Sequence, residues 1–527
     1  MTRTSGRPVA AVGLALAILA YVGCSSKTAA PPTAPGPVTE GPAPPPPPPL
    51  AAGEKLFTNW PTPVGAIVIS GQQNGYLDPC GCTEGQKGGL GRRLDFLERL
   101  RAQKWPLALV DLGSLIEDPA TARGGPKQTE VKFTVALRAL ALMGYDALAL
   151  SADDLKLGVF EALGHVLNLG EKPRVVAANV AAVEGTGMDA VLRPALRTTA
   201  GSVPIGVTAV LDPKALAALN DPAKGDLLVV TDPAQALPGV LADLEKDTRI
   251  QVLLVQGPPQ TARTLALAHP GFEVVVATSP FADPPAEPEL LNGGKTMLVS
   301  VGKKGQYLGV VGLFADPQRP LRYQRVTLNT RYKKAEPMRK LIDEDFPAEL
   351  KALGVLENYP RHAYIHGAGG STYVGAESCK GCHPNTYTKW ASTKHAHAYD
   401  ALTKDPRRNR EADAECVSCH TTGFTYTSGF VTAELTPLLK HNQCENCHGP
   451  GSAHAAAPDD TEIRKAMIVT VEQADKSGLC LRCHDEDNDP HFNFAKYYGQ
   501  IVHKGMDTYT DPEVHRGIPP KVARKAP

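Results

Sequence analysis

The pentapeptide Cys-x-x-Cys-His occurs four times in the last third of this 527-residue chain, at residues 379–383, 416–420, 444–448 and 480–484, here called the first to fourth motif. Two thiols at this spacing can form thioethers to the two vinyl groups of one porphyrin, and the adjacent histidine then lies beneath the ring as an iron ligand. The motifs therefore predict four covalently attached c-type haems. The attaching cysteines would be Cys379, Cys382, Cys416, Cys419, Cys444, Cys447, Cys480 and Cys483, and the proximal ligands His383, His420, His448 and His484.

Chance does not explain this repetition. With 11 Cys and 15 His in the chain, a shuffled sequence would contain roughly 0.007 such motifs. Zinc sites and disulfide frameworks also use paired cysteines, but neither requires a histidine directly after every second one. The 55 basic and 55 acidic residues give a formal net charge of zero, so no overall field steers the chain toward nucleic acid, and no nucleic-acid partner is predicted.

Residues 1–23 are typical of an export signal, with Arg3 and Arg7 ahead of an apolar stretch at residues 9–22. This stretch is too short and too early to favour a membrane span. The following Tyr21-Val22-Gly23-Cys24 resembles a bacterial lipobox, with Tyr where Leu is common. The resemblance implies lipidation of Cys24, and Ser25 after it favours the outer membrane, on the periplasmic or the surface face. An ordinary cleaved signal with an incidental cysteine is the alternative.

Residues 24–60 are rich in proline and alanine, a composition that cannot bury a core and favours extended polyproline II. The proline-rich segment, residues 29–50, would act as a semi-rigid spacer that reaches roughly 70 Å, at about 3.1 Å per residue. A recognition role for the proline run is the alternative.

Residues 61–330 predict a layered α/β domain, because short Val- and Leu-rich runs alternate with helical patterns. Strands are expected at 66–70, 107–112, 147–150, 175–178, 205–210, 227–230, 252–255, 274–277 and 297–301. Helices are expected at 90–104, 131–143, 155–167 and 233–244. Residues 331–372 are predicted to be a connector with a helix interrupted at Pro347, and residues 511–527 a tail.

Several segments of this domain resemble the 5'-nucleotidase and UDP-sugar-hydrolase type of metallophosphoesterase. They are Ile67-Val68-Ile69-Ser70-Gly71 and the loop after it, Gly88-Gly89-Leu90-Gly91-Arg92, Val110-Asp111-Leu112-Gly113, Gly144-Tyr145-Asp146, and Gly305-Gln306-Tyr307-Leu308-Gly309. The resemblance implies a metallophosphoesterase-like fold. It also implies a two-metal hydrolytic site, so the residues of this chain can be compared with the metal ligands that the family has at those positions.

The expected metal ligands are absent from those positions in the sequence. Gln72 and Asn74 occupy the Asp-x-His motif, Ser114 replaces the bridging Asp, and Ala152-Asp153-Asp154 replaces the Asn-His motif with its Glu. A two-metal site needs several converging carboxylates and imidazoles. We therefore expect a domain without its metals that serves as a docking or spacer module, and keep a metal-dependent phosphohydrolase as the alternative.

The remaining cysteines of this domain, Cys80 and Cys82, form a Cys-Gly-Cys sequence in a loop after the first predicted strand. Such a pair could bind a soft metal, form a redox disulfide, make a protein contact or be two inert thiols. A redox sensor centred on this pair is a further hypothesis.

Residues 373–510 resemble the tetrahaem cytochrome c-554 family. The resemblance lies in Trp390 followed by His395-Ala396-His397, in Cys419-His420-Thr421-Thr422-Gly423, and in Cys444 to Gly451. It implies a mainly α-helical domain packed around its haems, with His395, His454 and His503 as distal ligands. It also implies that the haem of the second motif is five-coordinate.

The histidine count independently favours bis-histidine ligation. Thirteen of the 15 histidines lie at or beyond His362, and only four are needed as proximal ligands. His/His ligation generally gives a lower potential than His/Met. His397, His441 and His491 are reserve ligands, so one of them could fill the fourth distal site. His362, His366 and His515 are taken as structural.

The favoured function is electron transfer by an exported, lipid-anchored tetrahaem cytochrome with redox proteins as partners. An oxidoreductase that reduces a small nitrogen or sulfur oxyanion at an open haem is the first alternative.

Overall fold

The computed structural model describes residues 56–80, 85–185, 187–188, 190–217, 219, 228–365 and 370–507. Cys24, Cys82, His366 and His515 lie outside these ranges, as does the predicted signal. All of the described residues belong to one compact unit. No helix among the described residues is both long and apolar enough to cross a bilayer.

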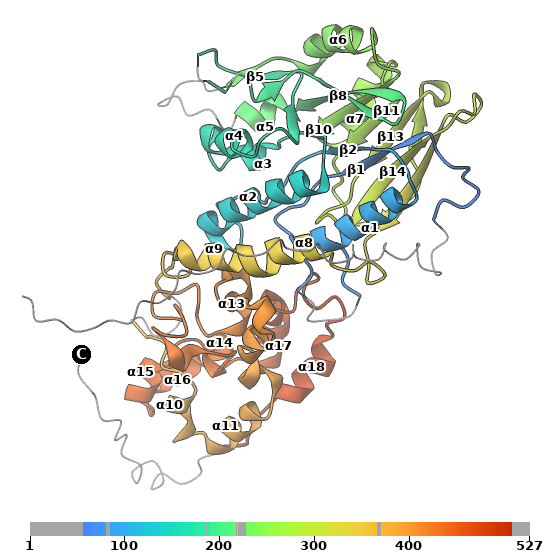
Figure 1. The fold of residues 1–527 in the computed structure, drawn as a ribbon. Coiled ribbons are helices and arrows are strands. Elements are labelled where there is room, and N and C mark those ends of the chain that lie inside the picture. Colours follow the sequence, from blue (N-terminus) through green and yellow to red (C-terminus); the bar gives the residue numbers. More distant parts are fainter. Residues whose placement is uncertain are drawn as a thin grey trace, which may run out of the picture. The chain divides into compact units, whose positions relative to one another are not determined.

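The first part of this unit contains a seven-stranded sheet in the order β15-β14-β1-β2-β3-β4-β6 (Figure 1). The strands are β1 (Gly65–Ser70), β2 (Leu107–Asp111), β3 (Ala147–Leu148), β4 (Arg174–Val176), β6 (Leu192–Arg193), β14 (Tyr307–Leu313) and β15 (Leu321–Thr327). The run from β1 to β6 is parallel, whereas β14 pairs antiparallel with both β1 and β15.

A six-stranded sheet in the order β12-β13-β11-β10-β8-β7 packs against the first. It comprises β7 (Leu196–Ala200), β8 (Val203–Leu211), β10 (Ile250–Gln256), β11 (Val274–Ala277), β12 (Glu289–Leu291) and β13 (Thr296–Ser300), and a separate ribbon pairs β5 (Val180–Ala182) with β9 (Leu228–Val230). The 3-10 turn η1 (Asn292–Gly294) joins β12 to β13. The central strands β8, β10, β11 and β13 are mutually parallel.

Alternating side chains of the buried strands face different layers, as the two-residue period of a strand requires. In β1, Ile67 and Ile69 belong to the core between the two sheets, and Ala66 and Val68 to the core on the outer face. Helices α1 (Leu90–Ala102) and α2 (Gly125–Met143) cover that outer face, and α6 (Pro233–Leu244) and α7 (Pro259–Ala268) cover the second sheet. The predicted layered α/β architecture is confirmed.

Shorter helices complete this part of the chain. They are α3 (Ala152–Leu155), α4 (Val159–Leu167) and α5 (Pro213–Ala217).

The predicted connector contains a helix that belongs to the core of the α/β part. Segments α8 (Glu336–Arg339), η2 (Lys340–Asp345) and α9 (Phe346–Ala352) adjoin one another, and their buried side chains join the core that includes α1 and α2. The helical path continues past Pro347, but its α-helical geometry is interrupted just before the proline, where η2 ends and α9 begins. Because η2 is a π-helical stretch placed just before the proline, the wider turn accommodates the carbonyl group that Pro347 cannot pair with.

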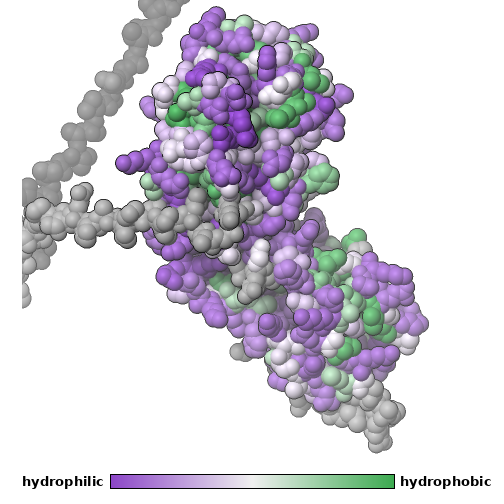
Figure 2. Space-filling model, turned by 90° about the vertical axis from the view of Figure 1, so that its right-hand side faces the viewer, coloured by the Kyte–Doolittle hydropathy of each residue, from purple (hydrophilic) through white to green (hydrophobic). Residues whose placement is uncertain are grey.

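The cytochrome-like part consists of short helices joined by loops, so the predicted mainly α-helical character is confirmed. The helices are α10 (Glu377–Lys380), α11 (Pro384–Ala391), η3 (Lys394–His397), α12 (Asp400–Thr403), η4 (Pro406–Arg408), α13 (Ala414–His420), η5 (Pro437–Leu439), α14 (Cys444–His448), α15 (Ser452–Ala456), α16 (Thr461–Ala466), α17 (Val471–Lys476), η6 (Cys480–Arg482) and α18 (Phe494–Ile501). In this part, Figure 2 shows hydrophobic side chains on the surface among hydrophilic ones.

Candidate haem-binding site

Each of the four motifs begins in a short helix or helical turn. The first begins in α10, the second ends α13, the third is α14 itself, and the fourth begins in η6. In the first and fourth motifs, the backbone N–H of the histidine closes a turn onto the first cysteine, and the distances His383 N–Cys379 O and His484 N–Cys480 O are both 2.9 Å. The helical turn places both thiols and the histidine on adjacent positions, which is the arrangement that haem attachment requires.

Three motif histidines face a second histidine from a distant part of the chain. The ring centroids are 6.2 Å apart for His383 and His454, 5.8 Å for His448 and His503, and 6.1 Å for His484 and His395. The structure therefore brings all three predicted distal histidines to a motif histidine. It also assigns each one to a particular motif, which the sequence did not.

These distances fit an iron ion held between two imidazoles. A metal–imidazole bond is about 2 Å long, and the ligating nitrogen lies roughly 1 Å from its ring centroid, so two rings on opposite sides of one metal have centroids about 6 Å apart. In the haem-bearing protein these three pairs would hold the iron from both sides, and the haems would supply reversible one-electron chemistry.

Hydrogen bonds at Nδ1 orient several of these imidazoles. His420 donates to Ala398 O over 2.5 Å, His448 to Met467 O over 2.7 Å, and His484 to the carboxylate of Asp489 over 2.8 Å. Because a carbonyl or carboxylate oxygen only accepts, Nδ1 carries the proton and the Nε2 lone pair is left for a metal. Asp489 was not identified from the sequence, since acidic residues are common after the fourth motif.

Burial also keeps the imidazoles neutral. It lowers the pKa of His383, His395, His420, His448 and His454, with nearby histidines adding to the effect at His383, His395 and His448. A neutral imidazole is the form that ligates metals.

The second motif differs from the other three. Among the described residues, no other imidazole faces His420 at the distance seen in the three pairs. The reserve ligands His397 and His441 lie beside each other instead, with centroids 6.4 Å apart, and His441 Nδ1 accepts a hydrogen bond from Tyr399 N. His491 is exposed. His362 pairs its backbone with the strand-like segment at Thr425 and Thr427, in keeping with a structural role.

The motifs touch one another in a definite order. A hydrogen bond to Cys444 raises the pKa of the Cys379 thiol, and one to Cys419 raises that of Cys483. Burial and then the nearby Cys480 raise the pKa of Cys447 to about 11. The first motif is thus next to the third, the third next to the fourth, and the fourth next to the second. In the haem-bearing chain these sulfur atoms would be thioethers.

Apolar side chains around the third and fourth motifs are available to cover a porphyrin. Exposed ones in this region are Ile468, Val471, Leu481, Val502 and Met506. A cluster of exposed apolar residues generally marks a binding surface.

The positions of the phosphoesterase metal ligands are occupied by residues bonded to one another. Gln72 exchanges two hydrogen bonds with the backbone of Ser279, at 3.0 and 2.6 Å. The buried carboxylate of Asp154 accepts from the backbone N–H groups of Ser114, Ile116 and Ser151. These contacts fix loops, and the oxygens that could have ligated a metal are used in them.

Asp111 is likewise committed to a buried network. It accepts from Ser70 Oγ and from Gly113 N, and Arg93 Nη1 lies 3.4 Å from its Oδ2. The two side chains of the ion pair are 1% and 0% exposed. A guanidinium in contact with the carboxylate does not fit a site for a metal cation, so we derive no hydrolytic step here.

Cys80 lies 3.2 Å from Gln86 Nε2, which also donates to Asp487 O over 2.8 Å. The loop of Cys80 therefore contacts the segment after the fourth motif. Its partner Cys82 is outside the described residues, and the roles considered for the pair stay hypotheses.

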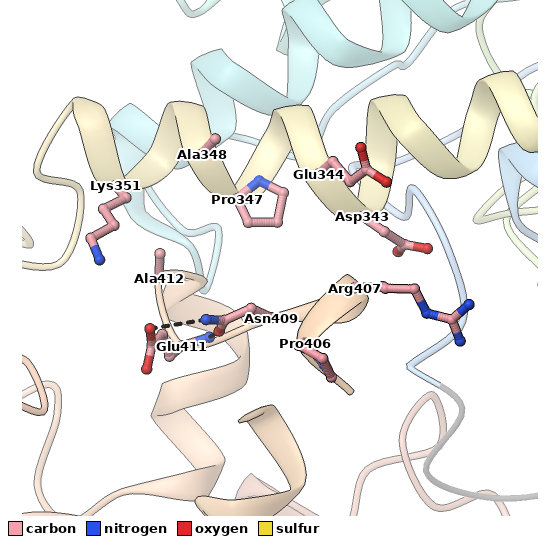
Figure 3. Close-up of a pocket in the computed structure, with 10 residues that line it drawn as sticks. All are labelled: Asp343, Glu344, Pro347, Ala348, Lys351, Pro406, Arg407, Asn409, Glu411 and Ala412. Carbon is pink, nitrogen blue, oxygen red and sulfur yellow. Dashed lines mark hydrogen bonds between the residues drawn. The ribbon is translucent and has the colours of Figure 1, made fainter. Parts of the chain in front are cut away.

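A pocket between the connector helix and residues 406–412 is separate from the motifs (Figure 3). Its lining includes Lys351, Arg407, Glu344 and Glu411, but neither a histidine nor a cysteine. It offers no ligands for a haem.

Sequence reasoning missed one group of residues at the second motif. Arg123, Gln128 and Lys132 of the α/β part contact α13 or Cys419. In the sequence, no pattern distinguishes these polar residues from ordinary surface residues.

Paired thiols followed by histidine, with a second imidazole facing three of those histidines, define a c-type cytochrome site. Residues 378–449 match the family model described as cytochrome c554 and c-prime, a range that contains the first three motifs. A curated relative, cytochrome c-554 of Nitrosomonas europaea, is 31% identical over 96 residues, which are 16% of this chain and 41% of the relative. The chain thus matches less than half the length of that relative. These matches support binding of c-type haem by this part of the chain.

Solved phosphoesterases resemble the structure at low sequence identity. A 5'-nucleotidase precursor from Thermus thermophilus has a TM-score of 0.46 and 15% identity, covering 64% of this chain and 68% of that one. The calcineurin-like phosphoesterase YfkN from Bacillus subtilis has a TM-score of 0.44 and 15% identity, covering 55% and 98%.

Proposed function

We propose that this chain is an exported, lipid-anchored tetrahaem cytochrome that transfers electrons through bis-histidine haems. The observation that carries the proposal is the set of three facing imidazole pairs, each joining a motif histidine to one of His454, His503 and His395. Filled axial positions favour electron transfer over substrate binding, because no coordination site is left for a substrate.

The order of contacts between the motifs supports a relay. Neighbouring cysteines link the first motif to the third, the third to the fourth, and the fourth to the second. The protein's part in such a relay is to hold the haems close together, orient them by axial ligation and limit solvent access. The first and second motifs are the ends of this series, so redox partner proteins would exchange electrons there.

The α/β part would act as a docking or spacer module. Its Arg93–Asp111 pair and the committed oxygens of Asp154 favour a structural role over hydrolysis. Lipidation at Cys24 would hold the protein to the bacterial outer membrane, and the proline-rich segment would separate it from the bilayer. Replacing Cys24 with serine should move the protein from the membrane fraction to the soluble fraction.

A redox titration followed by electron paramagnetic resonance tests the proposal. We expect four haem irons per chain, of which three are low-spin and one is high-spin. Fewer than four haem irons, or high-spin signals from the motifs with facing histidines, would contradict it.

A second candidate function follows from the second motif. Since no described imidazole faces His420 as in the other pairs, its haem would have an open position for a small nitrogen or sulfur oxyanion. Addition of nitrite or nitric oxide should then change the high-spin signal alone. A fully low-spin spectrum that does not change when either ligand is added would rule this function out.

A further inference from the structure

The α/β part supplies a charged side chain to the junction of the second and fourth motifs. Arg123 lies just before α2, its Nη1 is 3.8 Å from Cys419 Sγ, and its Nη2 donates to Asp485 Oδ2 over 2.9 Å. Cys419 attaches the second haem, whereas Asp485 directly follows the fourth motif. The guanidinium also acts on Cys483 of the fourth motif, and Asp485 also acts on Cys419. One ion pair thus lies between the second and the fourth haem sites.

Hydrogen bonds at Arg123 itself and farther along α2 hold Arg123 in position. Its carbonyl oxygen accepts a hydrogen bond of 3.0 Å from Tyr359 Oη. Farther along α2, Gln128 donates to Asp413 over 2.7 Å and accepts from Ala414 N over 2.8 Å, so it holds the start of α13. α2 is therefore attached to the helix that contains the second motif.

A partly buried ion pair strengthens this attachment. Lys132 of α2 pairs with Glu415, the residue before Cys416, and the lysine side chain is 9% exposed. Burial opposes the lysine charge, but Glu415 and Asp413 outweigh it and raise the pKa of Lys132. The two carboxylates at the start of α13 thus each have a cation beside them, Lys132 at Glu415 and Arg410 at Asp413. Arg123 is different because its carboxylate partner belongs to the neighbouring motif.

A fixed charge near a haem changes its reduction potential. A positive charge disfavours the more positive ferric state and raises the potential, and a negative charge lowers it. The guanidinium of arginine stays protonated at any pH that a protein tolerates. Its effect at the second haem would therefore be permanent.

We propose that the Arg123 guanidinium raises the reduction potentials of the second and fourth haems, and that Asp485 opposes this effect at both. This inference rests on the proposed electron-transfer function. The α/β part is accordingly a component of the electron path as well as a docking or spacer module.

The experiment is a redox titration of the full, haem-bearing chain and of four variants, with midpoints resolved by visible and paramagnetic resonance spectra. Arg123→Gln should lower the midpoints of two haems, one of which is the high-spin one. Arg123→Lys should restore both midpoints. Asp485→Asn, which keeps an oxygen for the loop hydrogen bonds at Oδ1, should shift midpoints the opposite way, to higher potential.

Arg197→Gln is the matched control, because Arg197 also pairs with carboxylates, those of Asp243 and Asp247, but lies among residues of the α/β part alone. Its midpoints should equal those of the unmodified chain. Unchanged midpoints in Arg123→Gln, or shifts of the same sign in Arg123→Gln and Asp485→Asn, would overturn the proposal. Failure of the proposed function would instead appear in the unmodified chain, as missing haem.

Discussion

His395 and His484 lie ring to ring, with centroids 6.1 Å apart, although one follows the first motif and the other ends the fourth. His395 is held in η3, and its carbonyl accepts a hydrogen bond from Asn442 N, while Trp390 Nε1 donates to Asn442 O. A shared iron would therefore connect the two ends of the cytochrome-like part.

This pairing predicts the effect of His395→Ala. The fourth haem would lose its distal ligand, so one low-spin signal of the three should become high-spin in the paramagnetic resonance spectrum. His397→Ala is the control, since that side chain is 66% exposed and pairs with Asp400. If His395→Ala left the three low-spin signals intact, the assignment of His395 to the fourth motif would be wrong.

The cytochrome-like part should depend on haem for its fold. In the described part of residues 440–507, Ala474 is the only buried alanine, valine, leucine, isoleucine, methionine or aromatic side chain. So small a core does not offset the entropy of ordering the chain. Protein made without haem maturation should lose the circular dichroism of these helices, and proteases should cut it beyond residue 440. Near-native spectra and resistance to proteases would contradict this expectation.

The Arg93–Asp111 pair should be important for the stability of the α/β part. Arg93→Met leaves a buried carboxylate without its partner, which costs about 3–5 kcal/mol of unfolding free energy. The exposed pair of Lys246 and Asp243 provides the control, because Lys246→Ala should change stability by less than about 1 kcal/mol. Urea unfolding followed by the fluorescence of Trp60 and Trp105, both in this part, measures the difference. Equal losses of unfolding free energy in the two variants would show that the buried pair contributes no more to stability than the exposed pair.

Asp154 should make the α/β part less stable as pH rises. Burial raises its pKa to about 7, against hydrogen bonds that favour the charged form. The folded state then holds a proton that the unfolded state, with a pKa of about 3.9, has released. Between about pH 4 and pH 7, this group lowers the unfolding free energy by up to about 1.4 kcal/mol per pH unit.

Comparison with Asp154→Asn isolates this effect, because asparagine has nearly the same shape and does not titrate. Urea unfolding at several pH values from 5 to 8 should give a smaller slope for the variant below pH 7. Parallel slopes for both proteins would contradict the raised pKa.

Local patterns were sufficient to predict the layered domain. Runs such as residues 66–70 and 274–277 correspond to β1 and β11, because a strand buried on both faces must be apolar throughout. The antiparallel strand β15 was missed, since its polar alternate residues, such as Arg322 and Gln324, give no continuous apolar run. The segment at residues 305–309, noted only for its family resemblance, leads into β14, whose pairing with β1 depends on tertiary contacts.

For the candidate haem site too, the sequence predicted some features, whereas others depend on tertiary contacts. The excess of histidines over proximal ligands predicted bis-histidine ligation, and the family resemblance implied His395, His454 and His503 as the distal ligands. Which motif each one faces depends on how loops cross in space, and the sequence does not contain that in any local pattern. The contacts of Arg123 likewise depend on the tertiary structure and are not contained in a local sequence pattern.

The central claim is that the four motifs bind haem covalently, and the intact mass of the purified, matured protein tests it most directly. We predict the mass of the polypeptide with four haem groups, none of which is removed by acidified organic solvent. A mass without haem, or haem that is extracted by this solvent, would contradict the account.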